Sequence, residues 1–267
     1  MRGVWLAGVL AAMAVMPCPA AAAMHWAPAP VEHEKGHGGH DRSAGKAFVL
    51  VDGEGANLTL INPKLLEKPL ASEGSSVTLK ATGMGNYHAL LARRSQAGLQ
   101  ESAIRYHYMN GKPSGTSPSL LIAHEKSALE IVPDPLAREH WRYYANTDAR
   151  FIVRFQGKPL AGATVMMATT NGTTVGFMAD ADGNLSIPLP EDFAEVKAGR
   201  ADNRPAEFVL TASHHDGDSR FVTTFSAAYH VNPEQWQSTG LGLATAGGGM
   251  LLGGVMIWRM RRRKEDK

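Results

Sequence analysis

The stretch FIVRFQGKPLAGATVMMATTNGTTVGFMADADGNLSIPL, residues 151–189, decides the fold class of this chain. Short apolar runs alternate in it with turn residues, and the pairs Asn171-Gly172 and Asp182-Gly183 are typical of tight hairpin turns. With further runs at 207–212 and 221–225, the stretch predicts five or more short antiparallel strands. We therefore expect a small β-sandwich over residues 133–236, with strands at 151–155, 163–168, 174–178 and 185–189.

The residues before this unit are also typical of strands. Apolar runs at 48–51, 58–61, 76–81, 119–123 and 128–132 are separated by turn residues. Pro133-Asp134-Pro135 then breaks the chain, and we place a domain boundary there, so that residues 47–132 form a first β unit. The expected fold class is all-β, with two small antiparallel β-sandwich units.

The two ends of the chain have the patterns of export and membrane insertion. Residues 1–23 combine Arg2, an apolar run and small residues, which is typical of a cleaved signal peptide. Residues 239–258 are uncharged and long enough to span a bilayer as a helix, and a basic tail, 259–267, follows. By the positive-inside rule the tail is cytoplasmic, so we expect a single-pass inner (cytoplasmic) membrane protein with a periplasmic or extracellular ectodomain. Gly249 and Gly253 form a G-x-x-x-G pair, which either supports homo-association or is simply tolerated in a membrane helix.

Charge and cysteine content exclude several classes of function. The formal net charge is +2, but the tail contributes +4 and Arg2 a further +1, which leaves −3 for the segment between them. That segment offers no argument for nucleic-acid binding. The single cysteine, Cys18, lies in the expected signal peptide, which excludes a disulfide framework and a cysteine-rich metal site. The eleven histidines are therefore the abundant candidates for metal ligands.

Four of these histidines lie in a polar, glycine-rich segment, residues 24–46, which we expect to be a flexible arm. Three of them, His33, His37 and His40, have acidic residues at 32, 34 and 41 around them. Short histidine-rich tracts are typical of metal binding, although a solvated spacer has a similar composition.

His25 adds a second possibility at the start of the same arm. If the signal peptide is cleaved after Ala22, His25 is the third residue, and the amine, two deprotonated amides and the imidazole form a square-planar site for Ni(II) or Cu(II). If cleavage follows Ala23, an amine and imidazole pair remains. The alternative is that a histidine near an N-terminus has no function.

His214, His215 and Asp216 are the third group of candidate ligands, expected in a turn between the strands at 207–212 and 221–225. A polar hairpin loop is the alternative. The segment 180–184 is expected to be a β-turn, because an EF-hand would need glycine where Leu185 stands. No nucleophile–base arrangement or phosphate-binding loop is present in the sequence, so we do not expect an enzyme. Residues 106–108 are a candidate strand with His107 on one face. His107 and the isolated histidines are expected to be structural, and the isolated ones are His88, His124, His140 and His230.

Two segments resemble a known family. They are LEIVP at 129–133 with ARFIVRF at 149–155, and GKPLAGATV at 157–165 with ADADGN at 179–184. This pattern resembles a bacterial domain-of-unknown-function family linked to periplasmic components of cobalt or nickel uptake systems. The second unit is also similar to carboxypeptidase-regulatory-like and Ig-like sandwiches, a likeness of fold that carries no chemistry.

The resemblance implies a membrane-anchored, non-enzymatic protein that binds Ni or Co and hands it to an inner-membrane transporter. The residues add Cu as an alternative metal. Two other classes of function remain open at this point, a structural or protein-interaction module and a carbohydrate- or peptide-binding module.

Overall fold

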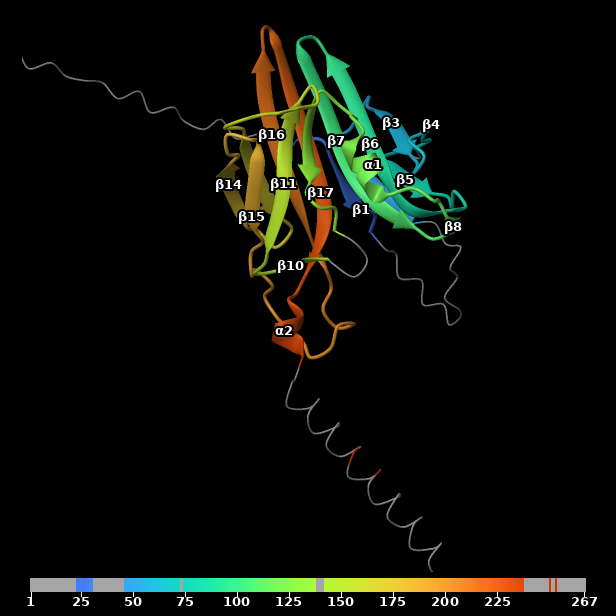
Figure 1. The fold of residues 1–267 in the computed structure, drawn as a ribbon, viewed down its shortest axis with the longest axis vertical. Helices are drawn as coiled ribbons and strands as arrows, with labels where there is room; N and C mark the ends of the chain where they lie inside the picture. Colours follow the sequence, from blue (N-terminus) through green and yellow to red (C-terminus); the bar gives the residue numbers. More distant parts are fainter. Residues whose placement is uncertain are drawn as a thin grey trace, which may run out of the picture.

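The computed structural model describes residues 23–30, 46–72, 74–137 and 142–237, together with Met250 and Gly253. Within these residues the fold is all-β, as predicted, and a ten-stranded sheet runs through its centre (Figure 1). The strands follow in the order β14-β13-β16-β17-β7-β6-β3-β4, with β10 beside β17 and β8 beside β6. Their bounds are β3 Asn57–Ile61, β4 Glu67–Pro69, β6 Met84–Gln96, β7 Leu99–Met109, β8 Lys112–Pro113, β10 Tyr143–Tyr144, β13 Thr164–Thr169, β14 Thr174–Met178, β16 Ala206–Asp216 and β17 Ser219–His230.

The central sheet contains strands from both of the units predicted as separate, residues 47–132 and 133–236. β17 lies parallel to β7, with Phe225 opposite Ile104. The expected boundary at Pro133 is also crossed by hydrogen bonds, because β9 (Leu129–Pro133) pairs with β11 (Asp148–Phe155). The expectation of two separate antiparallel sandwiches therefore needs a correction, since both halves of the described chain share one sheet that contains a parallel pair.

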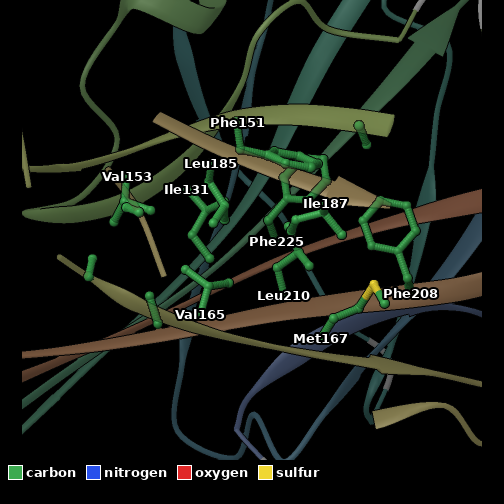
Figure 2. Packing of buried hydrophobic residues seen from close by; sticks show 14 of the residues in the cluster. Ile131, Phe151, Val153, Val165, Met167, Leu185, Ile187, Phe208, Leu210 and Phe225 are labelled. Atoms are coloured by element: carbon green, nitrogen blue, oxygen red, sulfur yellow. The ribbon is translucent and has the colours of Figure 1, made fainter. Parts of the chain in front are cut away.

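One face of the β13–β16–β17 half is covered by a second sheet. It contains β9 and β11 together with β12 (Lys158–Pro159) and β15 (Asn184–Pro188). Between the two sheets Phe151 meets Phe208 and Phe225, with ring centroids 5.3–6.4 Å apart (Figure 2). Apolar side chains that alternate along the strands fill this core, which is the arrangement that the hairpin pattern of residues 151–189 predicts.

The opposite face is covered at the other end of the sheet. A three-stranded sheet, β1-β2-β5, packs there over β3, β6 and β7, and its bounds are His25–Pro28, Lys46–Val51 and Ser76–Leu79. Successive residues of a strand point to opposite faces. Phe225 and Ile104 are paired neighbours and point to the same face, where Phe225 packs in the core beneath β9, β11 and β15. Ala103 precedes Ile104 and points to the other face, where it packs with Trp26 and Phe48. The described residues thus form cores on both faces of one sheet.

A short helix replaces one expected strand. Residues Pro118–Ala123 form α1, although the apolar run at 119–123 was expected to be a strand. The Ser117 side chain accepts a hydrogen bond from Ser119 N, and a proline stands in the first turn, which are both signals for a helix start. Leu121 packs from α1 against Leu91 and Ile104 on the sheet. A second short helix, α2 (Pro233–Trp236), follows β17 at one end of the molecule (Figure 1).

The expected membrane and export segments lie almost entirely outside the described residues. Only Met250 and Gly253 of the stretch 239–258 are described, and residues 1–22 and 259–267 are not. No helix within the described part of the chain is both long enough and apolar enough to cross a bilayer.

Candidate functional site

The start of the candidate arm is a strand, in contrast to the flexible segment expected from its composition. Met24 and Trp26 are each 1% exposed, and both belong to the core beneath β1-β2-β5. Trp26 Nε1 donates to the carbonyl of Ala103 at 3.1 Å, and Thr224 Oγ1 donates to the carbonyl of Met24 at 2.6 Å. These contacts fix β1 to the central strands β7 and β17.

β1 and β2, which flank the histidine-rich segment, pair with each other. Pro28 lies opposite Phe48, and Ala29 N donates to the carbonyl of Ala47 at 3.1 Å. Residues 31–45, which carry His33, His37 and His40, lie outside the described residues, but the chain on both sides of them is held in one hairpin. Because folding already brings the two ends together, closing this segment around an ion costs less entropy than ordering a free arm.

His25 lies on the outer side of this hairpin. Its neighbours Met24 and Trp26 point into the core, so the alternation of the strand directs the half-buried His25 side chain away from the central sheet. Its Nδ1 lies 2.8 Å from the carbonyl of Ala23. The Ala29–Ala47 bond and the antiparallel alternation place His25, opposite Val51, at a hydrogen-bonded position. A square-planar chelate through the His25 amide would therefore have to break the end of the ladder.

A charged group that the sequence analysis did not identify lies beneath the hairpin. Arg105 on β7 donates from both terminal nitrogens to Glu207 on β16, at 2.5 and 3.1 Å. The Arg105 guanidinium lies 5.1 Å from the Phe48 ring, and the Lys46 amine lies 5.6 Å from the same ring. The His107 ring also contacts Phe48, and the two ring centroids are 5.3 Å apart.

The environment of His107 keeps its imidazole neutral. Burial, then the positive charges of Lys46 and Arg105, lower the pKa of His107 to about 4. A neutral imidazole is the form that binds metals, but two cations beside it oppose a further cation. We therefore expect metal ligands among His33, His37 and His40 and not at His107. His88, opposite His107, has both ring nitrogens in contact, with the Thr82 hydroxyl at 2.8 Å and the Asn86 carbonyl at 3.0 Å, so it is a satisfied structural histidine.

His214, His215 and Asp216 do not form the expected turn cluster. All three belong to β16, and the turn begins only at Gly217. His214 lies with its ring 4.5 Å from Phe155, whereas His215 points to the other face of the sheet and is exposed. Over the described ranges no three His, Cys, Asp or Glu side chains come together in a metal-binding geometry.

The acidic turn at 180–184 is confirmed as a β-turn. Asp180 Oδ1 accepts from the amides of Asp182 and Asn184 at 2.9 and 2.8 Å, and Oδ2 accepts from the Asn184 side chain. Hydrogen bonds from Asn184, side chain first, lower the pKa of Asp180. The carboxylate is thus used to hold the turn.

A buried ion cluster, also missed from the sequence, has a structural role. Glu130 is fully buried and accepts from Arg154 Nε at 2.6 Å, with the Lys126 amine at 3.5 Å. Arg154 and Lys126 also donate to carbonyls at the end of α1. Burial lowers the pKa of Lys126 to about 8, against the opposing effect of Glu130. The cluster caps α1 and fixes it to β11.

Comparison with known proteins adds little to this geometry. No protein-family model and no curated protein matches the chain. Among solved structures, a tetra-tandem repeat in the extending region of a large adhesion protein is 10% identical, with a TM-score of 0.26, and the match covers 79% of this chain and 49% of the other. A structure of a 1.5-MDa bacterial ice-binding adhesin is 13% identical, with a TM-score of 0.26 and coverages of 71% and 58%. The chain thus spans about half the length of these structures.

Proposed function

We propose that this protein is a membrane-anchored, non-enzymatic binding protein that captures Ni(II) or Co(II), with Cu(II) as the alternative, outside the inner membrane and passes the ion to an inner-membrane transporter. Residues 1–23 direct export, residues 239–258 anchor the chain, and residues 259–267 remain in the cytoplasm. The ligands are His33, His37 and His40, with neighbouring carboxylates completing the coordination.

The observation that carries the proposal is the hairpin that holds both ends of the histidine-rich segment. β1 and β2 are registered from His25–Val51 to Pro28–Phe48, and the buried Trp26 and Met24 side chains fix them to the central sheet. Three imidazoles within eight positions, in a segment whose two flanking strands are paired, form with neighbouring carboxylates a nitrogen and oxygen donor set that suits Ni(II), Co(II) or Cu(II).

The amine and His25 chelate is a weaker candidate. It competes with the ladder position of the His25 amide and with the contact between Nδ1 and the Ala23 carbonyl. N-terminal sequencing of the mature protein tests which chelate is available, because only cleavage after Ala22 places His25 third.

The test is a calorimetric titration of the full chain in neutral detergent with Ni(II), Co(II), Cu(II) and Zn(II). We expect a Ni(II) or Co(II) site in the parent protein that is lost in a His33→Ala/His37→Ala/His40→Ala variant. The matched control, His214→Ala/His215→Ala, keeps the site, because those side chains point to opposite faces of β16. A protein with no site tighter than the buffer, or a triple variant with undiminished binding, contradicts the proposal.

A second function, a protein- or peptide-interaction module, is favoured by one observation. A groove of about 770 Å³ opens between β4 and the free side of β5, and Leu66 at its rim is 64% exposed. Its mixed lining suits an extended peptide added beside β5. A chain that binds no metal in the titration, and that loses a partner on Leu66→Asp, would favour this function over metal delivery.

A further inference from the structure

A small basic pocket is lined in part by α2. This helix lies at one end of the molecule (Figure 1). It has a volume of about 150 Å³, and its polar lining includes Arg142, Arg200, His230 and Asn203. Trp236, the last residue of α2, forms part of its wall. None of the residues that line it has a role in the metal proposal.

The pocket is built on the end of the central sheet. His230 is the last residue of β17 and lies beside Tyr144 of β10, and Ala145 N donates to its carbonyl at 2.8 Å. Arg142, two residues before Tyr144, places a terminal guanidinium nitrogen 3.4 Å from His230 Nε2. Two strands therefore set the positions of the imidazole and of one guanidinium.

The loop that carries Arg200 is held by Asn203. The Asn203 side chain donates to the carbonyls of Lys197 and Gly199 at 2.6 and 2.7 Å and accepts from Lys197 N at 2.9 Å. The backbone around Arg200 is thus fixed before any ligand arrives, which lowers the cost of binding.

The pocket is a positive site on a protein segment that is negative overall. No carboxylate lines it, and within the described part of the chain neither arginine takes part in an ion pair. Burial and then the charges of Arg142 and Arg200 lower the pKa of His230 to about 4, so that its imidazole is neutral near pH 7. Two guanidinium groups face one cavity, although the segment between the signal peptide and the tail carries −3.

We propose that this pocket binds the phosphate group of an anionic phospholipid, with Arg142 and Arg200 as the donors. Guanidinium groups match phosphate oxygens in pairs of hydrogen bonds. The expected membrane span begins at residue 239, and three residues of extended chain reach at most about 11 Å, so the pocket lies near the headgroups. Trp236, between the pocket and the span, is of the type enriched at membrane interfaces. The inference rests on the anchoring part of the proposed function and not on its metal site.

The test is lipid retention by the full chain, purified in a neutral detergent and measured by native mass spectrometry. Equal amounts of phosphatidylglycerol and phosphatidylcholine are added, with a parallel arm of inorganic phosphate as a competitor. We expect retention of phosphatidylglycerol at least ~10-fold above phosphatidylcholine, and the loss of that preference in Arg142→Gln/Arg200→Gln. Arg220→Gln, at the opposite end of β17, is the matched control and keeps it.

Three outcomes overturn the inference. They are equal retention of the two lipids, an unchanged preference in a double variant with the parent's circular dichroism and Tm, and displacement of the lipid by low millimolar phosphate, which would identify a site for free phosphate. Carbonate extraction of cell membranes separates this inference from the proposed function. A chain that stays in extracted membranes but lacks the lipid preference contradicts the pocket alone, whereas a chain released by carbonate contradicts the anchor.

Discussion

Two separate sheets pack on the two halves of the central sheet, on opposite faces, and these two covering sheets are held in different ways. Over β13, β16 and β17 the cover comes from strands joined by tight turns, and aromatic rings fill the space between the sheets. Asp192 accepts from the hydroxyls of Thr169 and Thr173, both at 2.7 Å, and from Tyr229. Over β6 and β7 the cover includes β1, a four-residue edge strand that is fixed mainly by Trp26 and Met24.

This difference divides the described chain into two parts. We call the β13–β16–β17 half with its covering sheet the scaffold, and the hairpin of β1 and β2 the device. In the β13–β16–β17 half, strands that are close in sequence pair with each other, as β13 does with β14 and β16 with β17. The sheet that covers the β6–β7 half includes β1, a strand that precedes the histidine-rich segment. Local opening follows the regions with the fewest buried contacts. We therefore expect the hairpin of β1 and β2 to open while the rest of the sheet stays folded, and the proposed ligands lie between these two strands in the sequence.

The largest effect is expected in the scaffold core. Phe151→Ala removes a ring that contacts Phe208 and Phe225, and it should lower the free energy of unfolding by about 3–5 kcal/mol. Denaturant unfolding measures the loss, and Phe151→Leu, which keeps most of the volume, is the control. A small loss from the alanine variant would show that this half is not the scaffold.

A smaller and local effect is expected for Trp26→Ala. It removes the main anchor of β1 and the hydrogen bond to Ala103, at a cost of about 3 kcal/mol, because an edge strand relaxes more than a core. Hydrogen exchange should show the loss in β1 and β2, with Thr164–Thr169 and Ser219–His230 still protected. Trp26→Phe keeps most of the packing and should open less. Uniform loss of protection in the alanine variant would contradict the division into scaffold and device.

The scaffold was the half that the sequence predicted best. Asn171-Gly172 and the Asp180 turn mark hairpins through local chemistry, and β13 and β15 bury every second residue. The β6–β7 hairpin was missed, because Ala89, Leu90, Leu91 and Ala92 are all buried, and a strand covered on both faces loses the alternation that identifies strands.

The sequence identified the histidines of the candidate site, but not the contacts that hold the strands on either side of them. His33, His37 and His40 stand out from their spacing, while nothing local shows that Trp26 contacts Ala103 or that Thr224 binds Met24, since these pairs are distant in the chain. For the same reason the sequence did not show Arg105 with Glu207, or the parallel pairing of β7 with β17. His214 and His215 are neighbours in sequence, but one strand directs them to opposite faces.

The smallest expected effect is a loss of stability in acid. It can be followed separately in the two halves, through one half-buried histidine in each of them. Burial is the main cause that lowers the pKa of both His107, beneath the hairpin, and His230, at the end of the scaffold, to about 4. The unfolded chain takes up protons near pH 6.5 and the folded one only near pH 4, so stability is complete above pH 6.5 and falls as pH drops between these values.

We expect the His107 contribution to be on the order of 1 kcal/mol, because its imidazole keeps part of its contact with solvent. His107→Gln should therefore raise the stability of the hairpin at pH 4.5 relative to the parent, with no change at pH 7.5, as followed by hydrogen exchange in Lys46–Val51. His230→Gln is the matched variant, and its gain should appear at the end of β17. If both variants protect the same segments, acid opens the two halves together, and the hairpin is not an independently opening part of the fold.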